Sequence, residues 1–344
     1  MDNAGNGRRG LRATPSAELL TAIQVSYNLD PIHEIQDLGG SSSLNLLVTR
    51  GAERYIARVY RPYTCTNRLN AMQSVRHTLL HGGIPCPEIL TTPYGATWIR
   101  FEGRLIEVEA FVEHDANMDT WERLETGLPW LGRIHSILRH YSVNAAGKTP
   151  LFANHIEPTN TLEGMEKTVR RVAAWPPSPE EHQILDVGMI LVERLAEAEQ
   201  EYLPLLVRQL THGDFWDNNV FFQSGQVVLI TDLDFMGERA RIDDLALTLY
   251  YASASIANFS ECRDRLRRLI EAYNSELAEP LTIAERAALP LALARQPLWW
   301  LAGWFPALDD DSLARRGFAE MLPEIQWSLE IMDHLEQWQA AFGA

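Results

Sequence analysis

The chain has 344 residues, which is more than one small domain needs and enough for two lobes that share a cleft. Hydrophobic residues make up 46% of the sequence, so a sizeable core can form and global disorder is not expected. The net charge of −16 argues against a nucleic-acid partner and admits a cationic substrate, although many enzymes are acidic simply for solubility. Three cysteines in no CxxC or zinc pattern favour a reduced, cytoplasmic setting.

The first part of the chain predicts a small lobe built from strands and one long helix. Residues 1–15 are polar and predict a flexible tail, and a short helix is expected at 16–27. A turn rich in glycine and serine, 37–43, comes next. The predicted strands are, in order, 44–49, 55–60, 96–100 and 104–112. A helix at 70–81 ends at two glycines, so residues 16–112 form one lobe of ordinary domain size.

The rest of the chain, residues 113–344, predicts a mainly helical lobe because apolar residues recur at helical spacing. The predicted helices are, in order, 121–138, 179–202, 243–257, 262–277, 283–304 and 313–341, and the fifth is expected to be interrupted near Pro290 and Pro297. Two short β-prone pieces, 220–222 and 227–230, interrupt them. The apolar stretch 289–305 contains an arginine and two prolines and is too short to span a bilayer, so no membrane association is expected. The pattern is that of an α+β protein with two lobes.

The strongest chemical signal is the pair of segments 211–219 (THGDFWDNN) and 230–237 (ITDLDFMG). Phosphoryl transfer needs a carboxylate near the attacking hydroxyl and oxygen ligands that hold magnesium on the phosphates. Asp214 and Asn219 are five positions apart, and Asp232 follows thirteen positions later, which matches the spacing of a kinase catalytic loop and metal site. The alternative is that these residues only form turns, where Asp and Asn are common, but two fixed spacings disfavour it.

These motifs also carry a family resemblance. HGDFWDNN with TDLDFMG resembles the aminoglycoside phosphotransferase and choline kinase family, which writes HGD where protein kinases have HRD. The similarity covers most of the chain and includes YIARVYRP at 55–62 and GRLIEVEAFV at 103–112. The first of these strands, and residues 281–286, look especially close to homoserine-kinase-like members. The resemblance implies a bilobal protein-kinase-like fold and a need for ATP or GTP with Mg²⁺.

The resemblance also implies roles for individual residues. Asp214 takes the place of the catalytic base, His212 orients the catalytic loop, and Asp244 braces that loop from behind. The implied metal ligands are Asn219, Asp232 and Asp234.

A glycine-rich turn ahead of the catalytic loop is a candidate phosphate-binding element. Its residues are Gly39, Gly40, Ser41, Ser42 and Ser43. Backbone N–H groups and hydroxyls of this kind can hold phosphates, although an ordinary hairpin turn looks the same in sequence.

Arg58 is the clearest departure from the family pattern. Relatives usually have lysine in this strand, where it pairs with the phosphates and with a glutamate on the following helix. Arginine can grip phosphate oxygens in the same place, although an alternative is a residue on the surface of the strand. The helix at 70–81 contains no Glu or Asp, so only Gln73 could accept a hydrogen bond from Arg58.

A second set of candidates lies in the connector between the two lobes. These residues are Glu109, Ala110, Phe111 and Val112. By the resemblance, their backbone hydrogen-bonds the purine ring, but a plain buried strand is an equally good description. Because backbone contacts do not read the base, ATP and GTP are not distinguished.

The acceptor substrate is the least specified part of the site. The candidate substrate contacts are Trp216, Asp217, Trp300 and Trp304. Aromatic residues beside the aspartates at 309–311 could bind an amine, although the same aspartates are typical of a helix N-terminus.

The sequence therefore predicts a kinase for a hydroxyl of a small, amine-bearing molecule, such as an aminoglycoside or an amino alcohol like homoserine or choline. A catalytically impaired, nucleotide-binding pseudokinase is the alternative, supported by the missing helix carboxylate. Oligomeric state is not encoded in any feature that we recognise.

Overall fold

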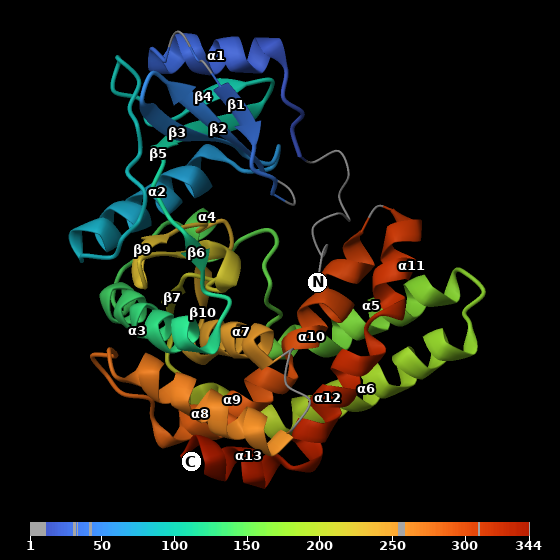
Figure 1. Ribbon diagram of the computed structural model, residues 1–344. Helices are drawn as coiled ribbons and strands as arrows, with labels where there is room; N and C mark the ends of the chain where they lie inside the picture. The colour runs from blue at the N-terminus through green and yellow to red at the C-terminus, as the bar shows by residue number, and fades with distance from the viewer. Residues whose placement is uncertain are drawn as a thin grey trace.

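The computed structural model describes residues 12–29, 32, 34–40, 43–253, 259–308 and 310–343. A small lobe with an antiparallel sheet stands on a larger helical lobe, so the predicted α+β fold is confirmed (Figure 1). Most of the predicted tail lies outside the described residues. Arg12, within it, donates to the carbonyl of Gly39 at 3.2 Å. No helix in the described part of the chain is long and apolar enough to cross a bilayer.

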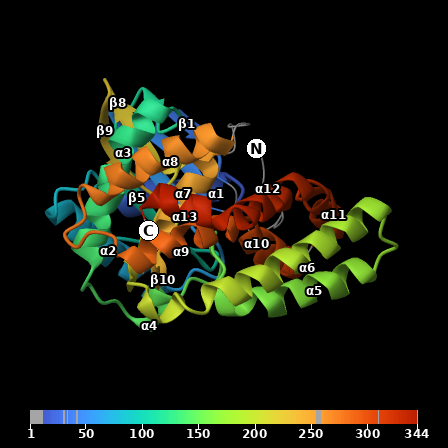
Figure 2. The same cartoon turned by 90° about the horizontal axis from the view of Figure 1, so that it is seen from below.

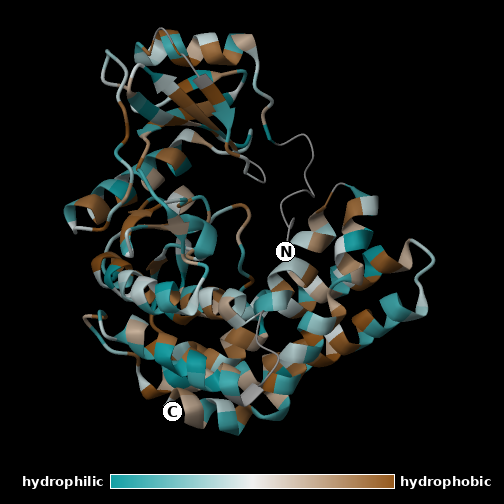
Figure 3. Cartoon of the chain, in the orientation of Figure 1, coloured by the Kyte–Doolittle hydropathy of each residue, from teal (hydrophilic) through white to brown (hydrophobic). Residues whose placement is uncertain are grey.

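The small-lobe sheet has five strands in the order β1-β2-β3-β5-β4, all antiparallel. Their bounds are β1 Glu34–Asp37, β2 Leu44–Arg50, β3 Glu53–Val59, β4 Ile99–Phe101 and β5 Arg104–Ala110. Glu102 and Gly103 join β4 to β5 with φ of 48° and 80°, the left-handed pair that a two-residue hairpin turn requires. Apolar residues concentrate on these strands (Figure 3).

Two helices flank this sheet. Helix α1 (Ala17–Tyr27) begins at Ser16, whose hydroxyl accepts the N–H of Leu19, and it buries Ile23 and Tyr27 in a core shared with the strands. Helix α2 (Thr66–His81) begins four residues before the predicted start and lies between the sheet and the large lobe (Figure 1). Apolar side chains of α2 belong to the core of the large lobe rather than to the core under α1. The helix therefore links the two lobes.

The large lobe contains most of the helices. Their bounds are α3 Trp121–Leu138, α4 Ala145–Lys148, α5 Thr161–Ala173, α6 Pro179–Glu199, α7 Arg241–Ser253, α8 Phe259–Asn274, α9 Ile283–Ala294, α10 Gln296–Leu298, α11 Asp311–Ala319, α12 Leu322–Asp333 and α13 Leu335–Phe342. The short strands are β6 Ala116–Asn117, β7 Arg208–Thr211, β8 Val220–Gln223, β9 Gln226–Ile230 and β10 Gly237–Ala240. The predicted helix at 243–257 is α7; its last four predicted residues lie outside the described residues.

The helical pattern was interpreted wrongly in three places. The single helix expected at 313–341 is three helices, since Pro323 occupies the first turn of α12 and His334 separates α12 from α13. Within 283–304 the interruption expected near Pro297 is confirmed, because α9 ends before α10, which contains Pro297. The interruption expected near Pro290 is wrong, since α9 continues through that residue, and the segment closes with a π-helical turn, Trp299–Trp304. Helix α5 was not predicted. It lies beside α6 in an arm that projects from the lobe (Figure 2).

The two segments that carry the catalytic motifs are brought together by short strands. Strand β7 pairs with β10, and Thr211 lies opposite Gly237. Strand β8 pairs with β9, and Val220 lies opposite Ile230. The loops 212–219 and 231–236 are therefore neighbours at one end of both strand pairs.

Candidate active site

Asp214 lies in the loop after β7 and is only 7% exposed. Its carboxylate accepts hydrogen bonds from the side-chain amides of Asn154 (2.7 Å) and Asn219 (2.9 Å), one on each oxygen. Asn219 also donates to the carbonyl of Asp214 at 2.8 Å. Burial, followed by the charge of Asp232, raises the pKa of Asp214 to about 8. The arrangement holds one carboxyl group in a single orientation at the end of a buried loop.

A second aspartate holds the loop from behind. The two carboxylate oxygens of Asp244 accept the backbone N–H groups of His212 and Gly213, each at 2.9 Å, and His135 contacts one of them at 3.0 Å. Gly213 has a φ of 84°, and a Cβ there would lie 2.1 Å from the carbonyl oxygen of Phe235. Only glycine therefore allows the two motif loops to approach so closely.

His212 lies in the same loop and contacts its backbone. Its Nδ1 accepts the backbone N–H of Asp214 at 3.3 Å, so this nitrogen carries no proton. Burial lowers the pKa of His212 and keeps the ring neutral. His212 thus contacts the backbone of Asp214, and its implied role in orienting the catalytic loop stays a prediction.

Three side chains present oxygen atoms beyond Asp214. The amide nitrogen of Asn219 is used by Asp214, so the amide oxygen faces away and has no hydrogen bond within the described residues. Asp232 has a φ of 66°, a conformation that aspartate adopts more readily than most residues, and accepts the N–H of Asp234 at 3.2 Å. One carboxylate oxygen of Asp234 is buried without a hydrogen bond.

This donor set fits a hard divalent cation such as Mg²⁺, which takes a few carboxylate or amide oxygens and completes its shell with water or phosphate. Within the described residues no three His, Cys, Asp or Glu side chains converge as a complete metal cage. A cation at this place therefore depends on Asn219, on Asp232 and Asp234, and on a ligand that brings its own oxygens.

Arg58 is buried, with 5% exposure, so it is not a surface residue of its strand. Its Nη1 lies 3.2 Å from Asp232 Oδ1 and 3.6 Å from Asp234 Oδ1. Burial alone would lower the pKa of Arg58, but the two aspartates outweigh it and raise the pKa above the usual value. The partner of Arg58, which the sequence did not identify, is therefore the pair Asp232 and Asp234 in the loop 231–236, called the metal loop below after its predicted role.

Gln73 does not accept a hydrogen bond from Arg58, so the prediction that it could do so is wrong. Its amide group donates to Glu107 at 2.8 Å and accepts from Thr97 at 2.7 Å. Helix α2 instead supplies the cation Arg76, which donates to Glu107 at 2.7 Å and to Glu109 at 3.0 Å, both on β5. The ion pair between helix and sheet exists, with the charges exchanged relative to the family pattern.

Of the four connector residues 109–112, few backbone or side-chain groups are left free by the described residues to hydrogen-bond a purine. The side chain of Glu109 is engaged by Arg76. The backbone N–H of Ala110 donates to the carbonyl of Glu88 at 2.9 Å, and that of Phe111 donates to the carbonyl of Arg54 at 3.1 Å. Val112 alone among the four has a backbone N–H without a partner in the described part of the chain.

The glycine-rich turn lies against the metal loop. Ser41 and Ser42 lie outside the described residues, so their predicted phosphate contacts stay a prediction. Gly39 and Gly40 have φ of 88° and 113°, which only glycine adopts without strain. The hydroxyl of Ser43 donates to Asp234 at 3.2 Å. This hydrogen bond joins the small lobe to the metal loop.

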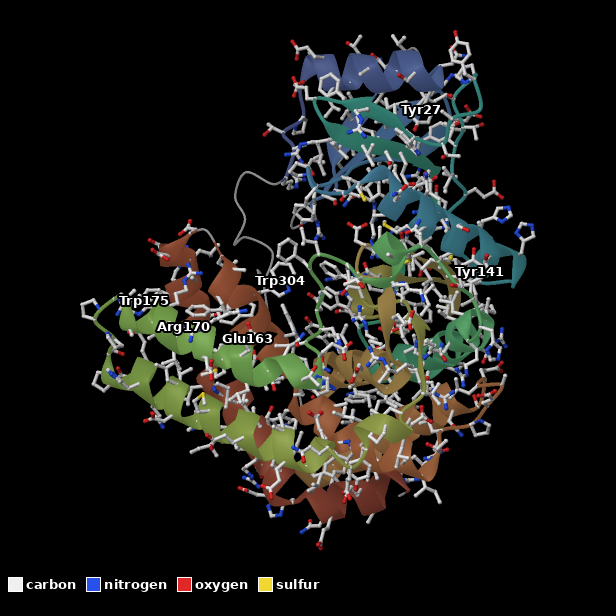
Figure 4. All side chains as sticks on the ribbon, turned by 180° about the vertical axis from the view of Figure 1, so that it is seen from behind. Tyr27, Tyr141, Glu163, Arg170, Trp175 and Trp304 are labelled. Carbon is white, nitrogen blue, oxygen red and sulfur yellow. The ribbon has the colours of Figure 1, made fainter. Side chains whose placement is uncertain are left out.

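The aromatic candidates separate into two groups. Trp216 stacks on Tyr251 with 4.7 Å between ring centres, and its indole N–H has no partner in the described residues. One carboxylate oxygen of Asp217 is also buried without a partner. Trp304, at the inner end of the helical arm, donates to the carbonyl of Ala153, beside Asn154 (Figure 4). These three side chains border the catalytic loop or the Asn154 segment.

Trp300, Asp310 and Asp311 do not share that position. Trp300 packs against Phe305, and a Cβ on Gly317 would collide with its ring. Asp310 caps α11 by accepting the N–H of Leu313, and Asp311 pairs with Arg171 at 2.7 Å. Asp309 lies outside the described residues. The helix N-terminus is therefore the correct description of Asp310 and Asp311.

Sequence reasoning missed two side chains that organise the site. Asn154 lies in an irregular loop, where no periodicity or motif marks it. Arg68, on α2, donates to the carbonyls of Asp234 and Met236, at 3.0 and 2.7 Å, and so holds the metal loop by its backbone. Its position in the first turn of a helix gives no local sign of this role.

The fold and the site define a protein-kinase-like phosphotransferase, and the comparisons with known proteins agree. Residues 34–281 match the model of the phosphotransferase enzyme family, APH, and the chain belongs to this family of enzymes. The chain is 28% identical to a homoserine kinase of Rhodopseudomonas palustris over 264 residues, which cover 74% of this chain and 73% of the relative. It is 26% identical to a homoserine kinase of Methylobacterium nodulans over 282 residues, or 80% of each chain.

Solved structures show the same fold at lower identity. An amicoumacin kinase, solved with AMP-PNP, Ca²⁺ and its antibiotic, superposes with a TM-score of 0.69 at 16% identity, covering 93% of this chain and 94% of that one. A microcompartment-associated aminopropanol kinase gives a TM-score of 0.68 at 15% identity, covering 95% and 99%.

Proposed function

We propose that this chain is an ATP- or GTP-dependent kinase that phosphorylates a hydroxyl group of a small, amine-bearing molecule. The observation that carries the proposal is the fixed Asp214 carboxyl, held by Asn154 and Asn219, next to the oxygen donors of Asp232 and Asp234. Phosphoryl transfer depends mainly on positioning and charge stabilisation, which this set of residues provides.

Each lobe has a part in this reaction. Val112 offers a backbone N–H to the purine, and Arg58 offers its guanidinium to the phosphates. Asn219, Asp232 and Asp234 would hold Mg²⁺, which neutralises phosphate charge when bound. Asp214 orients the acceptor hydroxyl and takes its proton. Since the charge of Asp232 helps to raise the pKa of Asp214, neutralising that charge lowers the pKa and favours the basic form.

An amine on the acceptor is supported by the charge around Trp216. Tyr251, which stacks on Trp216, has a raised pKa, first because it is partly buried and then because the carboxyl groups of Asp214, Glu324 and Asp217, negative when ionised, lie near it. Negative charge beside aromatic rings favours an ammonium group. Relatives that phosphorylate homoserine and aminopropanol make amino alcohols the first compounds to test.

A nucleotide-consumption screen tests this function. The full chain with Mg²⁺ and either ATP or GTP is offered homoserine, 1-amino-2-propanol, ethanolamine, choline and an aminoglycoside, and the phosphorylated product is measured by mass spectrometry. Amine-free matches, such as 1,2-propanediol, serve as controls. We expect product from at least one amine and far less from its match. Equal turnover of an amine and its amine-free match would contradict the proposal that the acceptor carries an amine. If no hydroxyl compound gave a phosphorylated product, the proposed kinase activity would be wrong.

The pseudokinase alternative loses its only support. It rested on the absence of a carboxylate partner for Arg58 on the helix, but Asp232 and Asp234 take that place.

A further inference from the structure

A cavity of about 620 Å³ lies behind the loop that carries Asn154. It is lined by the segment 148–160, the end of α6, the strand β10 and one side of α9. None of Asp214, Asn219 and Asp232 lines it. The cavity is therefore separate from the candidate active site, and the Asn154 loop forms a wall between the two.

Most charged side chains around the cavity are paired. Arg295 donates to Asp243 at 2.5 Å and to Glu199 at 3.0 Å. Arg208 donates to both carboxylate oxygens of Glu157, at 2.9 and 3.1 Å. At the rim, Lys148 pairs with Glu238 at 2.8 Å. Three cations of the lining are therefore neutralised within the protein.

Arg239 is the exception. It is 3% exposed and lines the cavity, and no carboxylate of the described residues lies within ion-pair distance of it. Its only hydrogen bond in the described chain runs from Nη2 to the carbonyl of Phe235 at 2.7 Å. Its other guanidinium N–H groups have no partner there. Carboxylates such as Asp243 and Asp244 act on Arg239 only from beyond ion-pair distance, and burial still lowers its pKa. A buried guanidinium without a direct ion pair is costly, so Arg239 is available to bind an anion.

The remaining polar groups leave Arg239 as the attractive point for an anion. Burial lowers the pKa of His155, so this side chain is neutral and adds no competing positive charge. Burial also raises the pKa of Glu199 to about 7, which reduces the negative charge that an incoming anion meets. Arginine binds carboxylate and phosphate groups through two N–H groups at once.

We propose that this cavity is a second binding site, which takes a small metabolite through a carboxylate or phosphate group paired with Arg239. The bound metabolite is an effector and not an acceptor, because no group of the candidate active site lines the cavity. Its position suits regulation. Arg239 holds the carbonyl of Phe235, the residue after Asp234, and the cavity wall at Ala153 and His155 flanks Asn154, which holds Asp214.

The test measures binding to the full chain by calorimetry, with inorganic phosphate and with succinate as separate probes. Saturating ADP and Mg²⁺ keep the nucleotide site filled. Two variants remove one buried arginine each: Arg239→Met in the cavity and Arg58→Met in the cleft. We expect at least one probe to bind the wild type and Arg58→Met alike. Its dissociation constant should rise roughly tenfold to a hundredfold in Arg239→Met, the range for losing a hydrogen bond to a charged group.

A second cavity variant keeps the test decisive if Arg239→Met does not fold. Ala288→Leu keeps every charge and fills part of the cavity, so it should also weaken the same probe. Comparing the phosphate and succinate titrations shows which oxyanion the site takes. Binding lost in Arg58→Met but kept in Arg239→Met would place the anion in the cleft and overturn the proposal. Failure of the wild type to bind either probe at millimolar concentration would also overturn it.

Discussion

Glu107 and Glu109 in the small lobe, and Asp232 and Asp234 in the cleft, are two pairs of carboxylates that face buried arginines. The first pair is satisfied: Glu107 receives hydrogen bonds from Arg76, Gln73 and Tyr60, and Glu109 from Arg76. The second pair is not satisfied, since one oxygen of Asp234 is buried without a hydrogen bond. A satisfied polar network stabilises a fold, whereas an unsatisfied one is expected where a ligand binds.

The same comparison explains the departure at Arg58. Arg76 on the helix pairs with both Glu107 and Glu109 on the sheet. Arg58 makes its ion pairs with Asp232 and Asp234, and Glu109 acts on it only at longer range. Arg76, Glu107 and Glu109 thus form a structural cluster, and Arg58, Asp232 and Asp234, together with Asp214, form a chemical cluster. If this division is correct, substitutions in the two clusters should have opposite effects on stability and on turnover.

The largest effect should follow substitution in the chemical cluster. Asp214→Asn keeps the shape of the side chain but removes the proton acceptor, so kcat should fall about 10²- to 10⁴-fold. The measurement is a coupled nucleotide assay, with nucleotide affinity determined separately and expected to persist. Asp186→Asn, on an exposed face of α6, is the matched control. Near-normal turnover of Asp214→Asn would show that this carboxyl is not the base.

The next largest effect should be on stability, in the structural cluster. Arg76→Met leaves two buried carboxylates without their cation, which should cost about 3–5 kcal/mol in the free energy of unfolding. Urea unfolding measures this cost. Arg133→Met removes the largely exposed pair with Glu276 and should cost no more than about 1 kcal/mol. Similar losses in both variants would mean that the buried cluster does not stabilise the lobe.

A third prediction concerns the pH dependence of stability, in which Asp214 of the chemical cluster should destabilise the fold. The pKa of Asp214 is about 8 in the folded chain and near 3.9 unfolded, so between these values the unfolded chain has lost a proton that the folded chain keeps. The carboxyl therefore destabilises the metal-free fold increasingly as pH rises from about 4 to about 8. Asp214→Asn should be more stable than wild type by up to about 5 kcal/mol above about pH 8, since about four pKa units at about 1.4 kcal/mol each separate the two states, and equal to it near pH 4.

Thermal unfolding in EDTA at both pH values measures this difference, with Asp186→Asn again as the control. A stability difference that stayed constant with pH would show that Asp214 is ionised in the folded chain already at low pH.

The smallest effect should come from Asn154, which only positions the reacting group. Asn154→Ala removes one hydrogen bond to Asp214, so kcat should fall about tenfold while nucleotide affinity stays the same. Gln183→Ala, on an exposed face of α6 and outside both sites, is a suitable control. A change in affinity with unchanged kcat would place Asn154 in nucleotide binding instead.

Much of the fold could be predicted because it depends on local patterns. The hairpin of β4 and β5, the long helix α3 and the pair β8–β9 lie where alternation, helical spacing and turn residues placed them. Errors arose where tertiary contacts compete with local preference. Helix α5 packs its small Gly164 against the turn at Ala302, where a Cβ on Gly164 would lie 2.2 Å from the carbonyl oxygen of Ala302. No local sequence pattern predicts this contact.

The catalytic motif itself was determined by the sequence. Asp214, Asn219 and Asp232 lie on loops next to short strands, and their spacing alone brings them together once β7, β8 and β9 form. The partners of these residues were decided only by the tertiary structure. Arg58 reaches Asp232, and Asn154 reaches Asp214, across long stretches of chain whose approach depends on how the lobes and the 148–160 loop pack. Such contacts leave no periodicity in the sequence, because each is made by a single side chain.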